Sequence, residues 1–282
     1  MSVNGNWLDM PLFTFLGFDC IRKTIGLSEH THKVFELTYI SEGECVWLTA
    51  KGQEIHLYGG WAAIIQPGEP HQGKWNVISP SRLFWAGFDP FHPEACLNTT
   101  FTPHEMAHIG NILKSAGNMA WKADKTTVEA FEDLRYALEL EKEGKEGVLS
   151  KASHRSTVCR LLAAIANSIS QNPVSRNCSE KIKNLETYIA VNIRKDISVS
   201  ELASQTGMSA ARFSERFKKE TGLSPADFIR RVRCEKACGL IKEGKLSITE
   251  IAFRLGFSSS QHFAGVFKKY TGMTPSQYKR QQ

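Results

Sequence analysis

The feature of this 282-residue chain that most constrains its fold is an internal repeat within the last hundred residues. The segment from Ile197 to Ser209 (ISVSELASQTGMS) aligns with the segment from Leu246 to Ser258 (LSITEIAFRLGFS) at an offset of 49 residues. The segment from Phe213 to Pro225 (FSERFKKETGLSP) aligns with that from Phe263 to Pro275 (FAGVFKKYTGMTP) at an offset of 50. A repeat of this length indicates two copies of one supersecondary unit.

Each copy opens with the signals of a short helix. Ser198-Val-Ser-Glu201 and Ser247-Ile-Thr-Glu250 fit the S-x-x-E capping box, in which the serine oxygen accepts from a free amide and the glutamate reaches back to the serine amide. Gly207 and Gly256 then stand where a glycine ends a helix in a tight turn. The first half of each copy is therefore predicted to be a short capped helix.

A second helix is expected after each turn, capped by Ser209 or Ser258. Two phenylalanines spaced four apart face inward in each helix, which leaves short polar residues and a lysine pair facing outward. The phenylalanines are Phe213 and Phe217, and Phe263 and Phe267; the lysine pairs are Lys218-Lys219 and Lys268-Lys269. This arrangement is typical of a helix-turn-helix recognition helix, which presents side chains to base edges and cations to phosphates. Between the copies, residues 225–243 are predicted to form one long helix that fixes the two units relative to each other.

Charge is distributed unevenly along the chain. Residues 179–282 contain 19 Lys and Arg against 10 Asp and Glu, net +9, whereas residues 1–178 contain 16 against 19, net −3. Such asymmetry is what a polyanion-binding domain attached to a neutral domain would have. A solvated charged surface is the alternative that charge by itself leaves open.

Length and composition favour two domains of an ordinary globular protein, since 41% of the residues are hydrophobic. We expect no membrane partner and a cytoplasmic location, because no apolar run is long enough to span a bilayer and the N-terminus lacks a secretion signal. The seven cysteines include no Cys-x-x-Cys pair, so buried reduced thiols are favoured over a metal or redox role, also for Cys234 and Cys238, which would share a helical face.

The distribution of tryptophan marks the same division, because all six tryptophans precede residue 122. A polar stretch interrupted by Pro173 follows the last apolar pattern and is the candidate linker. We therefore predict an α+β multidomain protein with a β-rich part at 1–100, a helical segment at 101–172, a linker at 173–180 and an all-α domain at 181–282.

The stretch from about Ile182 to Tyr278 resembles the DNA-binding domain of the AraC/XylS family of bacterial transcription regulators. The second copy carries the family signature at Ile251-Ala252, Gly256-Phe257, Phe263, Phe267-Lys268-Lys269, Gly272, Pro275 and Tyr278. The resemblance implies two recognition helices that enter successive segments of the major groove on one face of a duplex.

Positions matching the base-reading sites of this family are Ala211, Ser214, Glu215, Ser260, Gln261 and Gly265. Family members often have arginine at the sites of Glu215 and Gly265, so the resemblance implies an operator that differs from a guanine-rich one. Gly265 is open to two interpretations, close approach of the backbone to DNA or simple tolerance. The candidate phosphate contacts are Arg212, Arg216, Lys218, Lys219, Arg254, His262, Lys268 and Lys269, each of which has a solvated surface cation as its alternative.

The first half contains β-rich runs closed by Gly and Pro turns, which indicate a barrel or sandwich. His30-x-His32-x-x-x-Glu36, Gly43 and Pro67-Gly68-Glu69-Pro70-His71 resemble, more loosely, the cupin barrel that forms the sensor half of AraC-type regulators. The candidate effector-binding residues are His30, His32, Glu36, Tyr39, Trp47, Trp61, His71, Trp75 and Trp85, an aromatic and polar set suited to a sugar or another small organic molecule, with core packing as the alternative for any one tryptophan.

In metal-binding cupins, residues at the places of His30, His32, Glu36 and His71 converge on an ion. Three imidazoles and one carboxylate suit Zn, Mn, Fe or Ni. Sensor domains of the AraC type commonly retain this pattern without a metal, so we expect no cofactor and keep a divalent transition metal as the less favoured alternative.

Three segments from 103 to about 170 have apolar residues at helical spacing: 104–116, 126–143 and 153–169. In the family such helices pack beside the barrel and pair subunits, so a homodimer is expected. The leading prediction is a cytoplasmic activator that binds an operator in double-stranded DNA, contacts RNA polymerase and responds to a small-molecule effector; it is not an enzyme. Two alternatives remain open, a cupin metalloenzyme (an isomerase or dioxygenase) with an accessory helical domain, and a nucleoid-type binder without an effector.

Overall fold

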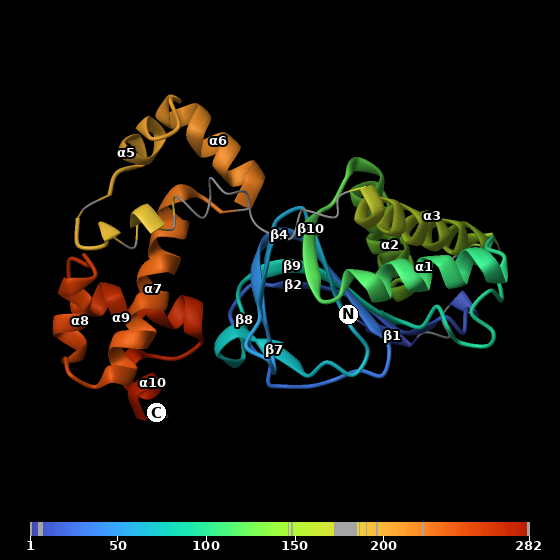
Figure 1. Cartoon of the computed structure of the whole chain (residues 1–282), viewed down its shortest axis with the longest axis horizontal. Coiled ribbons are helices and arrows are strands. Elements are labelled where there is room, and N and C mark those ends of the chain that lie inside the picture. The colour runs from blue at the N-terminus through green and yellow to red at the C-terminus, as the bar shows by residue number, and fades with distance from the viewer. Residues whose placement is uncertain are drawn as a thin grey trace. The chain divides into compact units, whose positions relative to one another are not determined.

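The computed structural model describes residues 2–4, 8–145, 147, 149–171, 185, 187–189, 191–195, 197–221 and 223–280 (Figure 1). The chain divides into two compact units. The first comprises Met1–Cys20, Glu29–Gln72 and Ser81–Asn177, and the second comprises Ile21–Ser28, Gly73–Pro80 and Cys178–Gln282. The predicted linker, 173–180, lies outside the described residues, so the proposed domain boundaries stay a prediction.

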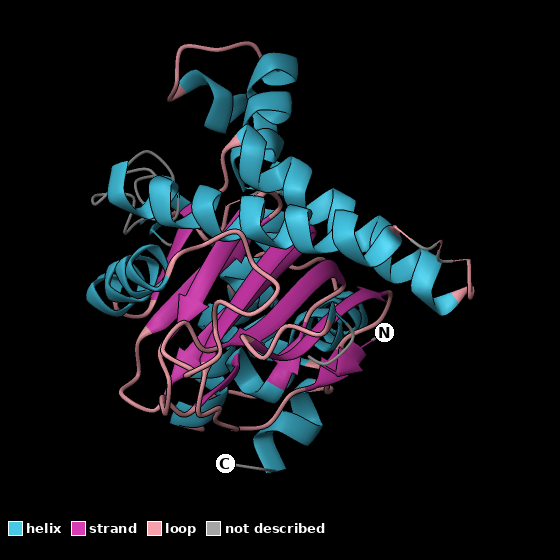
Figure 2. Ribbon diagram, turned by 90° about the vertical axis from the view of Figure 1, so that its right-hand side faces the viewer, coloured by secondary structure: helices cyan, strands magenta, loops and turns pink. Residues whose placement is uncertain are grey.

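An eight-stranded sheet forms the centre of the first unit (Figure 2). Its strand order is β1-β2-β9-β4-β6-β10, and β5 and β7 both pair with β4. The strands are β1 Ser2–Asn4, β2 Phe13–Ile21, β4 Phe35–Thr49, β5 Glu54–Tyr58, β6 Trp61–Ile65, β7 His71–Gly73, β9 Ser81–Phe88 and β10 Met119–Lys122. Two further strands, β3 Ile25–Gly26 and β8 Val77–Ile78, form a separate two-stranded sheet. The predicted β-rich runs are therefore strands, although the pairings among the described residues do not close into a barrel.

Three helices pack beside this sheet, as their apolar spacing predicted (Figure 1). They are α1 Pro103–Ala116, α2 Lys125–Lys142 and α3 Ser150–Gln171. Helix α1 begins at a complete capping box between Thr102 and Glu105, and α2 begins at Asp124, whose carboxylate accepts from the Thr127 amide. Side chains from one face of the sheet and from all three helices share a single hydrophobic core.

The C-terminal part of the second unit is all-helical and holds both copies of the repeat. Its helices are α5 Val199–Ser204, α6 Ala210–Thr221, α7 Pro225–Glu243, α8 Ile248–Arg254, α9 Ser260–Thr271 and α10 Pro275–Arg280. Helix α7 is the predicted long connecting helix and contacts α6, α8, α9 and α10. The four phenylalanines of α6 and α9 are at most 4% exposed and belong to one core. The α+β fold class, with a sheet-rich first half and a helical second half, is confirmed.

The helix starts differ from the prediction at two points. Ser247 and Glu250 form the complete capping box, but in the first copy the Glu201 carboxylate accepts from the Tyr188 hydroxyl at 2.6 Å, while Ser198 still caps the Glu201 amide. The cap of α9 is Ser259 rather than the predicted Ser258. The first difference arises because the Tyr188 hydroxyl competes for the Glu201 carboxylate, a contact that the repeat pattern does not encode. The second follows from the repeat itself, since the offset of 50 residues that aligns Phe213 with Phe263 also aligns Ser209 with Ser259. Within the described residues, no helix combines the length and apolar character needed to cross a bilayer.

Candidate nucleic-acid interface and effector site

The base-reading candidates share the outer surface of the two recognition helices. Because the phenylalanines of α6 and α9 face the core, the positions between them turn toward solvent. Four of the candidates are exposed and two are half-buried: Ala211, Glu215, Gln261 and Gly265, and Ser214 and Ser260, respectively. The Ser214 hydroxyl donates to the Ala210 carbonyl at 2.8 Å, as serines inside helices commonly do. The structure thus gives both copies an exposed polar surface at the predicted positions.

The phosphate-contact candidates lie on the same helices and next to them. Seven are exposed: Arg212, Arg216, Lys218, Arg254, His262, Lys268 and Lys269. The side chain of Lys219 is outside the described residues. Lys269 already has a partner, because its ammonium lies 3.3 Å from the Asp227 carboxylate, whereas Lys268 is in none of the ion pairs found in the described part of the chain. Of the two neighbouring lysines of α9, only Lys269 is therefore tied to a carboxylate of the helical block.

Asp227, in the first turn of α7, joins several parts of the helical block. It interacts with the Ser224 hydroxyl, Arg230 and Lys269, and its backbone carbonyl accepts from the Tyr270 hydroxyl at 2.9 Å. Burial favours a higher pKa for the Asp227 carboxyl, but the Ser224 hydrogen bond and the charges of Lys269 and Arg230 outweigh it and lower that pKa. The ionised carboxylate holds the start of α7 against α9.

Sequence reasoning missed the buried guanidinium of Arg233 on α7, which is 8% exposed. It donates to the Gly256 carbonyl in the turn of the second copy at 3.1 Å and to the Lys195 carbonyl before the first copy at 2.9 Å. Gly256 has a φ of +75°, and a Cβ there would lie 2.9 Å from the guanidinium. One signal in the sequence would have found this residue: Arg233 follows the apolar Ile229 by four positions, which places it on the buried side of the helix.

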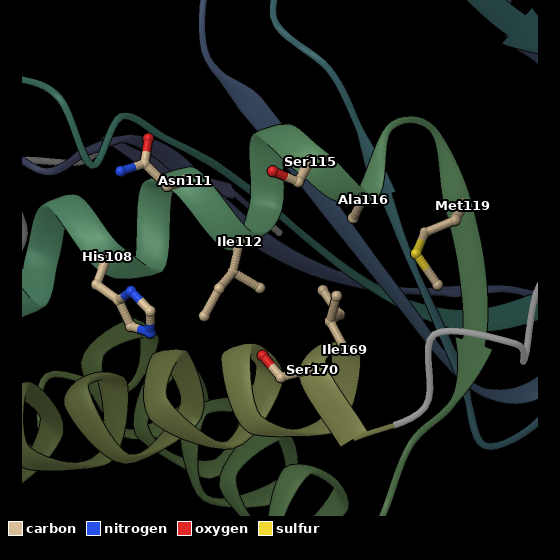
Figure 3. A pocket seen from close by; sticks show the side chains of 8 residues that line it. All are labelled: His108, Asn111, Ile112, Ser115, Ala116, Met119, Ile169 and Ser170. Carbon is tan, nitrogen blue, oxygen red and sulfur yellow. The ribbon is translucent and has the colours of Figure 1, made fainter.

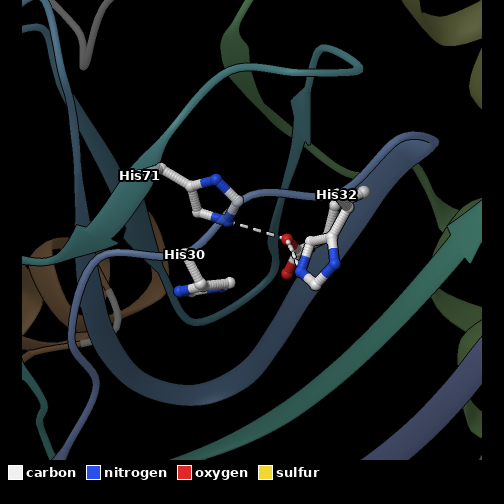
Figure 4. Close-up of side chains that lie close together, drawn as sticks. His30, His32 and His71 are labelled. Atoms are coloured by element: carbon white, nitrogen blue, oxygen red, sulfur yellow. Dashed lines mark hydrogen bonds and ion pairs between the residues drawn. The ribbon is translucent and has the colours of Figure 1, made fainter.

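In the first unit, the histidine and glutamate candidates converge (Figure 4). His30 and His71 are joined by a β-bridge in which each backbone amide donates to the other carbonyl at 2.9 Å. Glu36 enters from β4, and its Oε2 lies 2.8 Å from Nε2 of His71 and 3.4 Å from Nε2 of His32. One ligand atom from each of His30, His32, Glu36 and His71 lies within 4.8 Å of every other.

The electrostatics of this cluster centre on the buried Glu36 carboxylate, which is 5% exposed as a residue. Burial disfavours the imidazolium of His71, but the hydrogen bond and charge of Glu36 outweigh burial and raise the pKa of His71 above its ordinary value. The pKa of His32 is lowered, because burial disfavours its imidazolium and the attraction of the Glu36 carboxylate does not fully offset this effect. The two imidazoles beside one carboxylate therefore have different environments.

The aromatic candidates are only partly brought to this cluster. Trp47 lies edge-on to His71, with ring centroids 5.8 Å apart. Trp85 is opposite Thr38 in the β4–β9 register, so strand alternation puts it on the same sheet face as Glu36, where it is half-buried. The β4–β6 register puts Trp61, which is 5% exposed, on that face as well. Tyr39 lies on the opposite face and stacks on Phe131 of α2 at 4.2 Å, where burial raises its pKa to about 12.

Trp75 packs against the hydrophobic core of the helical block. It lies in the short 3₁₀ helix Lys74–Asn76, within the Gly73–Pro80 segment that groups with the second unit. For Tyr39, the structure therefore does not support the predicted place in the effector site, and for Trp75 that place stays a prediction.

A hollow of about 390 Å³ lies in the first unit between α1, β10 and the end of α3 (Figure 3). Its lining includes His108 and Ile112 of α1, Met119 of β10 and Ile169 of α3. None of the nine effector candidates lines it. The sequence pattern of these candidates predicted a site on the sheet face that holds Glu36 and gave no indication of this hollow.

A sheet domain with a polar cluster on one face, joined to a basic block with two exposed recognition helices, defines the class of ligand-responsive DNA-binding regulators. The model of a family described as "AraC-like ligand binding domain" matches residues 15–146, and that of a family described as "Helix-turn-helix domain" matches residues 202–281. The chain belongs to the AraC/XylS family of transcriptional regulators. It is a transcription factor and not an enzyme, which removes the metalloenzyme alternative.

Curated relatives resemble the chain over most of its length. "HTH-type transcriptional activator RhaS" of Escherichia coli (strain K12 / DH10B) is 24% identical over 257 residues, which are 88% of this chain and 85% of the relative. RhaS of Escherichia fergusonii is 25% identical over 264 residues, 89% of this chain and 87% of the relative.

Solved structures resemble it in part or in whole. The C-terminal domain of AraT from Geobacillus stearothermophilus is 30% identical, covers 38% of this chain and 88% of that one, and has a TM-score of 0.35. A singly substituted apo ToxT from Vibrio cholerae is 9% identical, covers 95% of this chain and 97% of that one, and has a TM-score of 0.37.

Proposed function

We propose that this regulator is a homodimeric transcriptional activator that binds a bipartite operator through α6 and α9 and responds to a sugar or related carbon source at the Glu36 face of its sheet. The observation that carries the proposal is the repeated surface: two capped helix-turn-helix units in one block expose corresponding positions while their phenylalanines share one core. The word activator is supported by the name of the RhaS relatives.

The exposed residues of the recognition helices support a particular kind of operator. Glu215 offers a carboxylate, which accepts from the exocyclic amine of cytosine, and Gln261 offers an amide, which pairs with adenine through two hydrogen bonds. Arg212, Arg216 and Lys218 lie beside these residues on α6 and are suited to phosphates. We therefore expect an operator in which cytosine and adenine contacts outnumber arginine contacts to guanine.

Subunit pairing is proposed to use the helical side of the first unit. Tyr136 on α2 and Leu149 before α3 are 59% and 78% exposed, which is unusual for side chains of this size. Pairing through these helices would present two helical blocks to two half-sites, and contact with RNA polymerase would follow on the DNA. Light scattering at micromolar concentration tests the pairing; a monomer both with and without effector contradicts it.

Selection of bound duplexes from a random pool tests the central proposal. The full chain is used with and without candidate sugars and related carbon sources, at two salt concentrations that separate phosphate from base contributions. We expect enrichment of a two-part motif whose halves lie about one helical turn, or about 34 Å, apart. Absence of any preferred duplex at moderate salt contradicts DNA recognition, and a motif whose enrichment no compound changes contradicts the effector part.

A further inference from the structure

We propose that His30, His32, Glu36 and His71 bind one divalent transition metal ion, and that this ion holds the effector through oxygen atoms of the effector. The first half of the proposal stands on the geometry of the cluster alone. The second half rests on the proposed function, because it assumes that a small molecule binds to this unit. The sequence left a metal as the less favoured alternative, and the arrangement of the side chains reverses that preference.

The spacing of the ligand atoms suits a single ion. Atoms bound at about 2.0–2.2 Å from one metal lie about 3 to 4 Å from one another. Nε2 of His71 and Nε2 of His32 are 2.8 and 3.4 Å from Oε2 of Glu36, and the whole set lies within 4.8 Å. Small side-chain rotations are enough to close it. The backbone already holds two ligands in place, because the β-bridge ties His30 to His71.

The hydrogen bonds of His71 leave a place for a cation. Its Nδ1 is 3.0 Å from the Glu69 carbonyl oxygen, which only accepts, so Nδ1 must be the N–H of the ring. Its Nε2 faces the Glu36 carboxylate at 2.8 Å, and an ionised carboxylate also only accepts. Either a second proton or a metal ion must therefore lie between these groups. An imidazole that donates its other N–H to a carbonyl is typical of metal ligands, because this bond fixes the ring orientation.

The composition of the cluster narrows the kind of ion. In the described part of the chain, the charge partners of the Glu36 carboxylate are His32 and His71, not a lysine or an arginine. Three imidazoles and one carboxylate, without a thiolate, suit Zn²⁺, Mn²⁺, Fe²⁺ or Ni²⁺ better than the hard ions Ca²⁺ and Mg²⁺, which prefer oxygen ligands only.

The surroundings of the cluster favour an oxygen-bearing ligand on the ion. His30 and His32 are only half-buried, so the cluster is accessible from one side, whereas Glu36 and His71 form a buried floor. Oγ1 of Thr38 and Nε1 of Trp47 are two of the buried side-chain atoms without a hydrogen-bond partner among the described residues. Thr38 shares the sheet face of Glu36, and Trp47 packs against His71. A hydroxy acid or a vicinal diol can bind a metal through two oxygens and offer further oxygens to such groups.

Titration calorimetry on the full chain, stripped with a chelator, tests the metal site with Zn²⁺ and Co²⁺ as probes. We expect about one ion per chain, and we expect bound Co²⁺ to give a visible absorption that differs from that of the aqueous ion. His32→Ala and Glu36→Gln are expected to weaken binding by at least 10-fold. His56→Ala is the matched control, because His56 on β5 also pairs with a glutamate, Glu54 at 3.2 Å, but lies outside the cluster. It should change the affinity less than twofold.

Each outcome decides between a metal site and a purely protonated cluster. Failure of the wild-type chain to bind either ion at micromolar concentration overturns the metal site, as does equal loss in His56→Ala and His32→Ala. Because His32 is half-buried, its variant remains informative even if Glu36→Gln does not fold. The measurement uses no DNA, so the metal site can stand while the proposed DNA recognition fails, and the reverse.

Calorimetry with a panel of sugars and hydroxy acids tests the effector half. It compares the metal-loaded chain, the stripped chain and His32→Ala. We expect at least 10-fold weaker binding of the best compound to the latter two. Equal affinity for all three overturns the role of the metal in holding the effector, and so does binding of no compound by the metal-loaded chain.

Discussion

Two adjacent lysines on α9 allow phosphate binding to be separated from structural support. Lys268 is exposed and is in none of the ion pairs of the described residues, whereas Lys269 pairs with Asp227 at 3.3 Å. Each phosphate contact contributes about 0.9 to the slope of log K against log salt, so one contact costs about 3.5-fold in affinity for a fourfold rise in salt. We expect Lys268→Ala to flatten the slope by about 0.9 and to leave the free energy of unfolding within about 0.5 kcal/mol of wild type.

Lys269→Ala is the matched control and should behave in the opposite way. Its side chain is 53% exposed, so the pair with Asp227 is screened by solvent and contributes at most about 1 kcal/mol to folding. We expect this loss in denaturant unfolding and a smaller change of salt slope than in Lys268→Ala. Affinities measured by fluorescence anisotropy on one selected duplex at several salt concentrations give both slopes. A full slope in Lys268→Ala with a flattened slope in Lys269→Ala would refute the reasoning.

Three further predictions concern the helical block. Gly256→Ala should lower the free energy of unfolding by about 1–3 kcal/mol, because φ is +75° there and the new Cβ would lie 2.9 Å from the guanidinium of Arg233. Gly207→Ala is the control: φ is +68°, but the new Cβ enters open space, so the loss should be only about 1 kcal/mol in the same denaturant titration. In Gly265→Ala and Gly239→Ala the new methyl group enters open space on a helix, so each variant should be about 0.5–1 kcal/mol more stable and melt at a higher temperature. Loss of DNA affinity in Gly265→Ala alone would indicate that the backbone approaches DNA closely at Gly265, and unchanged affinity would indicate that glycine is merely tolerated there. The folded-state pKa of Asp227 lies below its ordinary value of 3.8, so its carboxylate stabilises the fold above that pH. The stability advantage of wild type over Asp227→Asn should therefore shrink as the pH falls below about 4. An advantage that does not change with pH would contradict this.

Local signals predicted most of the helical block. Capping serines, terminal glycines and paired phenylalanines act within a few residues of one another, so their consequences can be derived without knowing the rest of the fold. The start of α8 at Ser247 and the burial of Phe263 and Phe267 follow directly from such signals. The contact between Glu201 and Tyr188 does not, because it joins residues 13 apart whose meeting depends on how Tyr188, which precedes α5, packs against that helix.

The candidate effector site was predictable only in part, for a related reason. Alternation along β4 predicts that a residue and its second neighbour share a face, and this puts Glu36 and Thr38 together. It does not reveal which face the helices cover. Tyr39 is three residues from Glu36, so it lies on the opposite face, and this is the face that the helices cover: Tyr39 stacks on Phe131 of α2. Its residue type would have suited a ligand site equally well. The β-bridge between His30 and His71 joins positions 41 residues apart and was not predicted; only the convergence of the four residues was implied, by the family resemblance.

Arg233 explains why two reading units can be treated as one. Its guanidinium is buried and divides its donors between a carbonyl at the turn of the second unit and a carbonyl at the approach to the first. Separating the two units would break both hydrogen bonds of that guanidinium and open the hydrophobic core that the units share, a loss of several kcal/mol. An effector that contributes a free energy of about 1–3 kcal/mol, the usual size of coupling between sites, is too weak to break this arrangement. We therefore expect an effector to act on the helical block as a whole, by changing how the block is presented to DNA, and to leave the spacing between α6 and α9 unchanged.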